Sequence, residues 1–172
     1  KNGMILHSSG TMGIEILSNH LNFGVFYPLQ TFSFSKKIDF TKTPILIEGN
    51  SQKSLEKLKE LCRILEVEFE EVDSKKRLHY HLAASFANNF TNHILSLTDE
   101  LVNKFKLEKK FFIPIANETF KKFQSNKSKE SQTGPAVRND VKTLKKHEEI
   151  LKKSNYLNLY KIITKSIRRN DL

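Results

Sequence analysis

Cysteine and tryptophan are nearly missing from this chain, and each scarcity narrows what the protein can be. The 172 residues include one cysteine and no tryptophan. The lone Cys62 excludes a disulfide within the chain and fits a reducing compartment. It lies among leucines in a helical pattern, so we expect a buried small hydrophobe rather than a nucleophile. The first residues lack the apolar core and cleavage site of a signal peptide, and we therefore expect a cytoplasmic protein.

Nucleotide- and metal-binding motifs are missing as well. The six glycines never form Gly-x-Gly-x-x-Gly, and Gly10 and Gly13 come nearest to it without the spacing. The sequence holds no P-loop, no zinc-finger spacing and no RNP-like aromatic motif. His79 and His81 point apart on a helix, so we expect no metal site. As given, the chain should bind a dinucleotide poorly.

The net charge of +10 does not by itself predict a nucleic-acid partner. Lysines are spread along the chain and mixed with glutamates, as in residues 54–60. The one run of three basic residues is 75–77, and Arg168 and Arg169 form the one pair of adjacent arginines. We expect no nucleic-acid binding, and steeply salt-dependent association with DNA or RNA would contradict this.

Residues 78–98 contain no Lys, Arg, Asp or Glu, although the rest of the chain is dense in charge. The run is long enough to span a membrane but too rich in His, Asn and hydroxyl groups for lipid, so we expect no membrane partner. At helical spacing one side is apolar: Leu82, Phe86, Phe90, Ile94, Leu97 and Leu101. The other side is neutral and polar: His81, Ser85, Asn88 and Asn92. Such a polar side suits a face buried against another protein surface or lining a cleft, while a core helix with satisfied polar groups is the alternative.

The order of the predicted elements indicates an α/β part followed by helices. Strands are expected at 4–7, 24–27, 44–48 and 67–72, with helices at 12–21 and from a Ser51 cap to about Leu65. Helices then follow at 74–105, 109–123, 137–153 and 157–169. We expect residues 1–73 to be the C-terminal portion of a Rossmann-like α/β domain, its first half being absent from the sequence. Residues 74–172 would form an all-α domain.

Two short segments follow predicted strands, where ligands gather in open α/β sheets. His7, Ser8, Ser9 and Gly10 end the first strand, and an ordinary turn with a capping serine is the alternative reading. Residues 27–32 (Tyr-Pro-Leu-Gln-Thr-Phe) follow the second, and Gln30 and Thr31 offer neutral hydrogen bonds.

Two further features come from the helical half. The imidazole of His81 could orient a carbonyl group or pass a proton. Gly134 and Pro135 are expected to start a helix whose N-terminal amides favour an anion, with Arg138 adding a bidentate grip. A structural Arg138–Asp140 pair is the alternative.

Taken in order, these motifs resemble a family. His7-Ser-Ser-Gly10, Tyr27-Pro-Leu-Gln-Thr-Phe32, His81-Leu-Ala-Ala84 with Asn89, and Thr133-Gly-Pro135 with Arg138 and Asp140 look like Rossmann-like oxidoreductases with a C-terminal domain of unknown function. Those proteins are similar to pyrroline-5-carboxylate reductase and 6-phosphogluconate dehydrogenase.

The resemblance implies an NADP or NAD cofactor and a helical domain that forms a homodimer. It places His7, Ser8, Ser9, Gly10, Gln30 and Thr31 near the nicotinamide, and His81, Asn89 and Arg138 in the substrate cleft. The family often has His where Tyr27 stands, and a basic residue where Leu78 stands; Arg77 is adjacent.

We therefore expect part of an NAD(P)-dependent oxidoreductase that transfers hydride to a carbonyl or imine of a small molecule. A non-catalytic helical dimerisation module is the alternative. Both hypotheses predict a homodimer, so oligomeric state alone does not separate them.

Overall fold

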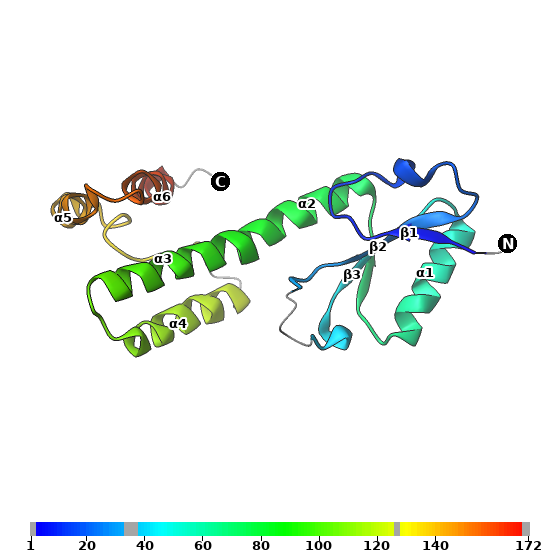
Figure 1. The fold of residues 1–172 in the computed structure, drawn as a ribbon, viewed down its shortest axis with the longest axis horizontal. Helices are drawn as coiled ribbons and strands as arrows, with labels where there is room; N and C mark the ends of the chain where they lie inside the picture. Colours follow the sequence, from blue (N-terminus) through cyan, green and yellow to red (C-terminus); the bar gives the residue numbers. More distant parts are fainter. Residues whose placement is uncertain (1–2, 33–37, 126–127, 170–172) are drawn as a thin grey trace. The chain divides into compact units, whose positions relative to one another are not determined.

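The computed structural model describes residues 3–32, 38–125 and 128–169 (Figure 1). The chain forms two compact units, Lys1–Phe105 and Lys106–Leu172. The first holds the sheet and the uncharged helix, and the second is helical. The α/β fold class with a helical C-terminal part is thus confirmed. The functional boundary expected near residue 73 stays a prediction.

Four strands form one mixed sheet in the order β1-β2-β3-β4. Their bounds are Ile5–His7 (β1), Phe23–Pro28 (β2), Ile45–Gly49 (β3) and Phe69–Glu71 (β4). β1 pairs with β2 in parallel and β3 with β4 in parallel, but β2 and β3 run antiparallel. The carboxyl ends of β1 and β2 therefore meet at one edge, so the two sequence motifs that follow them lie at the same end of the sheet.

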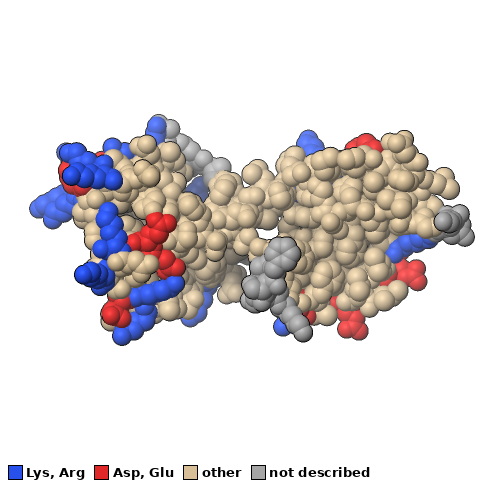
Figure 2. Space-filling view, in the orientation of Figure 1, with Lys and Arg blue, Asp and Glu red and all other residues tan. Residues whose placement is uncertain are grey.

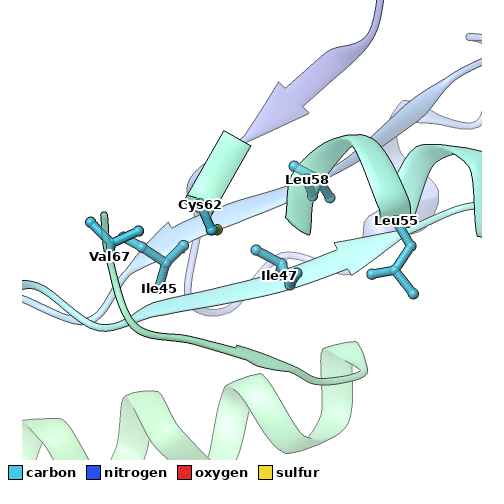
Figure 3. Packing of buried hydrophobic residues seen from close by; sticks show 6 residues of the cluster. All are labelled: Ile45, Ile47, Leu55, Leu58, Cys62 and Val67. Carbon is cyan, nitrogen blue, oxygen red and sulfur yellow. The ribbon is translucent and has the colours of Figure 1, made fainter. Parts of the chain in front are cut away.

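Helix α1 (Gln52–Ile64) covers the sheet and completes its core (Figure 3). The Ser51 side chain accepts a hydrogen bond from Ser54 N–H, as the capping pattern predicts. The core cluster consists of Ile45, Ile47, Leu55, Leu58, Cys62 and Val67. Burial raises the pKa of the Cys62 thiol, in line with a packing role. Leu65 lies beyond the helix end and is exposed, so its place in the expected stripe was wrong.

The connection from β1 to β2 is not the helix expected at residues 12–21. It contains one short 3₁₀ turn, η1 (Ile14–Leu17). Side chains accept from backbone N–H groups of this connection: Ser9 Oγ accepts from Met12 N–H at 3.0 Å, and Ser74 Oγ from Ile14 N–H at 3.1 Å. A second 3₁₀ turn, η2 (Phe40–Lys42), precedes β3.

The long helix expected from about residue 74 to 105 exists, but it is interrupted. It comprises α2 (Ser74–Ala84), a π-helical stretch η3 (Ser85–Phe90) and α3 (Thr91–Lys104). In an α-helix of 3.6 residues per turn, side chains four positions apart point in somewhat different directions. The wider turns of a π-helix bring these side chains closer to alignment. The exact four-residue steps of Leu82, Phe86, Phe90 and Ile94 fit this widening.

The apolar side of this helix is only partly buried. Leu97 lies in the interior, but Leu82, Phe86, Phe90 and Ile94 are exposed, Phe86 by 62%. Phe86 and Phe90 contact each other edge to face, with ring centroids 4.9 Å apart.

The second unit contains the 3₁₀ turn η4 (Lys109–Phe111) and helices α4 (Ile113–Gln124), α5 (Val141–Leu151) and α6 (Leu157–Arg169). His147 Nδ1 lies 2.9 Å from the Tyr160 hydroxyl and joins α5 to α6. Figure 2 shows basic and acidic side chains interspersed over the left part of the drawn face. Within the described part of the chain, no helix is long and apolar enough to cross a membrane.

Candidate functional site

The loop after β1 is shaped by its own side chains. Ser9 N–H donates to His7 Nδ1 at 3.2 Å, and Ser9 Oγ accepts from the N–H groups of Thr11 and Met12 at 3.2 and 3.0 Å. Ser9 is thus a turn-capping serine, whereas Ser8 is exposed. Because these bonds fix the turn, they also fix the imidazole of His7 at the strand end.

Arg77 ties this loop to the rest of the unit. Its side chain is 0% exposed. Nε donates to the Ser9 carbonyl at 3.1 Å, and the terminal nitrogens donate to Glu48, the Met12 carbonyl and Ser74 Oγ. Glu48 in turn accepts from Ser74 N–H at 3.0 Å. The guanidinium of Arg77, four residues before His81, is therefore engaged inside the protein.

His7 has one ring nitrogen, Nε2, that makes no well-formed hydrogen bond within the described residues. Since Nδ1 accepts a backbone N–H, the neutral imidazole must carry its proton on Nε2. That atom is buried and makes no hydrogen bond of normal length and angle within the described residues, although an interaction with the Gly13 backbone raises the pKa of His7 and offsets part of the effect of burial. Burial, and secondly the charge of Arg77, lower the pKa of His7, so the imidazole stays neutral at pH 7.

Gly10, Tyr27 and His81 meet at the same end of the sheet. The Tyr27 hydroxyl lies 3.1 Å from His81 Nδ1, and the rings meet edge to face. Burial raises the pKa of Tyr27, so its phenol stays protonated, and the hydroxyl either donates to Nδ1 or accepts from it according to the tautomer of His81. A Cβ at position 10 would lie 2.6 Å from His81 Nδ1, so this close contact requires glycine.

Other predicted residues lie apart from this cluster. Gln30 and Thr31 are exposed after β2, where Gln30 Oε1 accepts from Thr31 N–H at 2.8 Å. Asn89 is exposed in η3. The structure thus brings His7, Gly10 and His81 to one end of the sheet. The side chains of Gln30, Thr31 and Asn89 are instead exposed.

The anion-binding helix start expected at Gly134 and Pro135 was wrong. Those residues lie in turns, and α5 begins only at Val141. The Asp140 carboxylate occupies the amide end of α5 by accepting from Thr143 N–H at 3.0 Å, and the Thr143 hydrogen bonds lower the pKa of Asp140. Arg138 is exposed in the second unit.

A cavity of about 390 Å³ opens beside this turn in the second unit. Its lining mixes both charges with apolar groups: Lys129, Glu130, Gln132, Ala136, Val137, Asn139, Ile167 and Arg168. Arg168 donates to Asn139 Oδ1 across it. Sequence reasoning missed this cavity, as it missed the Arg77–Glu48–Ser74 network, because both depend on residues far apart in the chain.

Comparison with known proteins places this geometry in context. Residues 43–167 match the family described as Domain of unknown function (DUF2520). This range includes Arg77, His81, Asn89 and Arg138, whereas the His7–Gly10 loop precedes it. No curated protein matches the chain significantly.

Two solved structures are similar over nearly the whole chain. A Bacteroides fragilis protein that carries the provisional name NADP oxidoreductase is 34% identical, with a TM-score of 0.90. The match covers 96% of this chain and 65% of that protein, so the chain spans less than two thirds of its relative. A Thermotoga maritima protein, 24% identical with a TM-score of 0.74 over 96% of this chain and 68% of its own, shares the fold.

Proposed function

Because the chain belongs to the family described as a domain of unknown function, DUF2520, we propose that it is part of an NAD(P)-dependent oxidoreductase. The proposed reaction is hydride transfer to the carbonyl or imine of a small molecule. The name of the Bacteroides fragilis relative supports the reaction class. The observation that carries the proposal is a pair of histidines, His7 and His81, at the end of the sheet where β1 and β2 stop.

The residues of this chain fit one end of a nicotinamide dinucleotide. His7, at the end of β1, is proposed to lie beside the nicotinamide. The diphosphate end has no glycine-rich motif here, and the relative is longer than this chain. Diphosphate binding is therefore not assigned to any residue of this sequence. The cofactor, when bound, supplies the hydride.

His81 is the proposed proton-carrying group nearest the substrate. We propose the tautomer in which Nδ1 accepts from the Tyr27 hydroxyl, because Nε2 then carries the proton and can donate it to a carbonyl oxygen or imine nitrogen. Asn89 and Arg138 are proposed to contact the substrate, Arg138 through an anionic group, and Gln30 and Thr31 to lie near the nicotinamide.

The test is a fluorescence titration of the full-length protein with NADPH and, separately, NADH. Saturable binding of either supports the proposal, and no binding above background ends it. Once a turnover assay exists, His81→Ala should lower kcat about 10²-fold or more, the ordinary contribution of a proton donor. Arg138→Ala should mainly raise KM.

A homodimer is part of the same proposal, and the exposed apolar side chains of η3 and its flanks support it. Leu82 and Phe86 are 57% and 62% exposed, and large apolar patches on single chains mark interaction surfaces. A second copy is the proposed partner. The same observation favours the alternative function, a non-catalytic dimerisation module. A dimer in sedimentation experiments that binds neither nucleotide would favour the module.

A further inference from the structure

One face of α2 carries three polar side chains that all contact the connection between β1 and β2. Ser74, Arg77 and His81 follow one another at spacings of three and four residues, so they share that face. Ser74 Oγ accepts from Ile14 N–H at 3.1 Å, and Arg77 Nε donates to the Ser9 carbonyl at 3.1 Å. The connection is thus held against the helix over two helical turns.

Arg77 holds the loop on both sides of the residue that contacts His81. Its guanidinium donates to the carbonyls of Ser9 and Met12, which flank Gly10 in the sequence. Gly10 is buried, and a Cβ there would lie 2.6 Å from His81 Nδ1, so the backbone of the loop is packed against the imidazole. The position of Gly10 beside the imidazole therefore depends on Arg77.

The effect of Arg77 on His81 runs through this loop. The side-chain nitrogens of Arg77 donate to Glu48, to Ser74 Oγ and to the two loop carbonyls. Because the guanidinium is engaged by these groups, it is fixed in place and can hold the loop in one position.

We propose that Arg77 is a positioning residue: it holds Gly10 against His81 and so keeps the imidazole in the orientation from which Nε2 donates its proton. This rests on the proposed function, which gives His81 that proton to donate. The Tyr27 hydroxyl, 3.1 Å from Nδ1, contacts the same ring from β2. A loop released from Arg77 would leave the ring to Tyr27 alone.

Arg77→Lys tests this role without removing the charge. The lysine ammonium keeps a cation for Glu48 but lacks the planar fork that reaches both loop carbonyls. Arg63→Lys, on an exposed side chain of α1, is the matched control. Ser74→Ala removes the acceptor of Ile14 N–H and is the milder second variant, to be used if Arg77→Lys does not fold.

The first measurement records the imidazole carbon–proton signals of the full-length, unliganded protein by NMR. In Arg77→Lys we expect the His81 signals to move towards those of an exposed histidine of the same helix, His79. The second variant should move them less far in the same direction. The signals of His147, which pairs with a tyrosine in the second unit, should stay in place, and the control should match the wild type.

The second measurement is turnover with and without His81, once a substrate is found. Arg77→Lys should lower kcat about tenfold to 10²-fold, the cost of misplacing a reacting group. In a His81→Ala background the same substitution should lower kcat no further, because a positioning residue acts through the group that it positions.

The outcomes separate the role of Arg77 from the proposed function. Unmoved His81 signals in a folded variant overturn the role of Arg77, and so do equal movements of the His81 and His147 signals. A further loss of kcat in the His81→Ala background overturns it as well. If the wild type binds neither NADPH nor NADH, the proposed function falls, whereas the imidazole signals still decide whether Arg77 orients His81.

Discussion

Two regions of the first unit differ in which kind of side chain they bury. Around Arg77, polar groups from the β1 loop, β3 and α2 are buried and hydrogen-bonded to one another. A few turns along the same helix, between Leu82 and Ile94, apolar side chains lie exposed. The buried polar network stabilises the end of the sheet where a ligand is proposed to bind, and the exposed apolar side chains farther along the helix are the proposed surface for a second copy.

The largest expected loss of stability comes from a substitution of Arg77 in the buried polar network. Arg77→Ala leaves Glu48 buried without its cation, and breaking a buried pair costs about 3–5 kcal/mol. We expect a corresponding loss in the free energy of unfolding, measured by urea denaturation. Lys76→Ala, which removes an exposed pair with Glu70, should cost no more than about 1 kcal/mol. Similar losses in both variants would refute the contrast.

A smaller loss of stability is expected from a substitution of Gly10, where the backbone contacts the Tyr27–His81 pair. Gly10→Ala inserts a methyl group 2.6 Å from His81 Nδ1, and such overpacking costs about 1–3 kcal/mol. Gly3→Ala, which meets open space, is the control and should leave Tm unchanged. An unaltered Tm for Gly10→Ala would show that the contact is loose.

The hydroxyl of Tyr27 allows a comparison between the two units. Tyr27→Phe leaves His81 Nδ1 without its partner, and Tyr160→Phe does the same to His147. Each should cost about 1 kcal/mol in urea denaturation. Only Tyr27→Phe should also weaken turnover, because only that pair belongs to the proposed site; equal turnover losses would argue against it.

The pH dependence of stability tests the neutral state of His7. Burial lowers its pKa in the fold, so between the folded and unfolded pKa values the unfolded chain binds more protons. Stability from this group is complete above about pH 6.5, the ordinary histidine value, and falls as the pH drops towards the folded pKa. His7→Asn should flatten this slope in Tm measured across pH, and an unchanged slope would assign it to other groups.

The smallest effect on folding is expected on the apolar side. Phe86→Ser removes an exposed ring and should change the free energy of unfolding of the isolated subunit by about 0.5 kcal/mol or less. If the surface binds a second copy, the same substitution should shift sedimentation from dimer to monomer. A large loss of subunit stability would instead show that the ring is needed inside the subunit.

Local signals in the sequence predicted the local structure well. The four strands, the Ser51 cap and the stripe of α1 follow from residues near one another in the chain. The β1–β2 connection could not be predicted in this way, because Ser74, sixty positions away, takes the N–H of Ile14. The burial of Arg77 likewise depends on Glu48 from another strand.

The candidate site was predictable in part. The strand-end rule pointed to His7 and Gly10, which lie close to Arg77 and His81 respectively. The sequence also held a clue to the π-helix, since steps of exactly four from Leu82 to Ile94 exceed the α-helical repeat. The start of α5 was placed too early because Asp140, a better cap than Gly134, stands six residues later.

The burial of the Cys62 thiol has a practical consequence for chemical labelling. Cys62 is 0% exposed, so maleimide reagents should not reach it in the folded protein. A cysteine engineered on the surface of either unit would then be the sole labelling position. Spin labels or fluorophores attached at such positions, one on each unit, would read out inter-unit separation without first removing the native thiol.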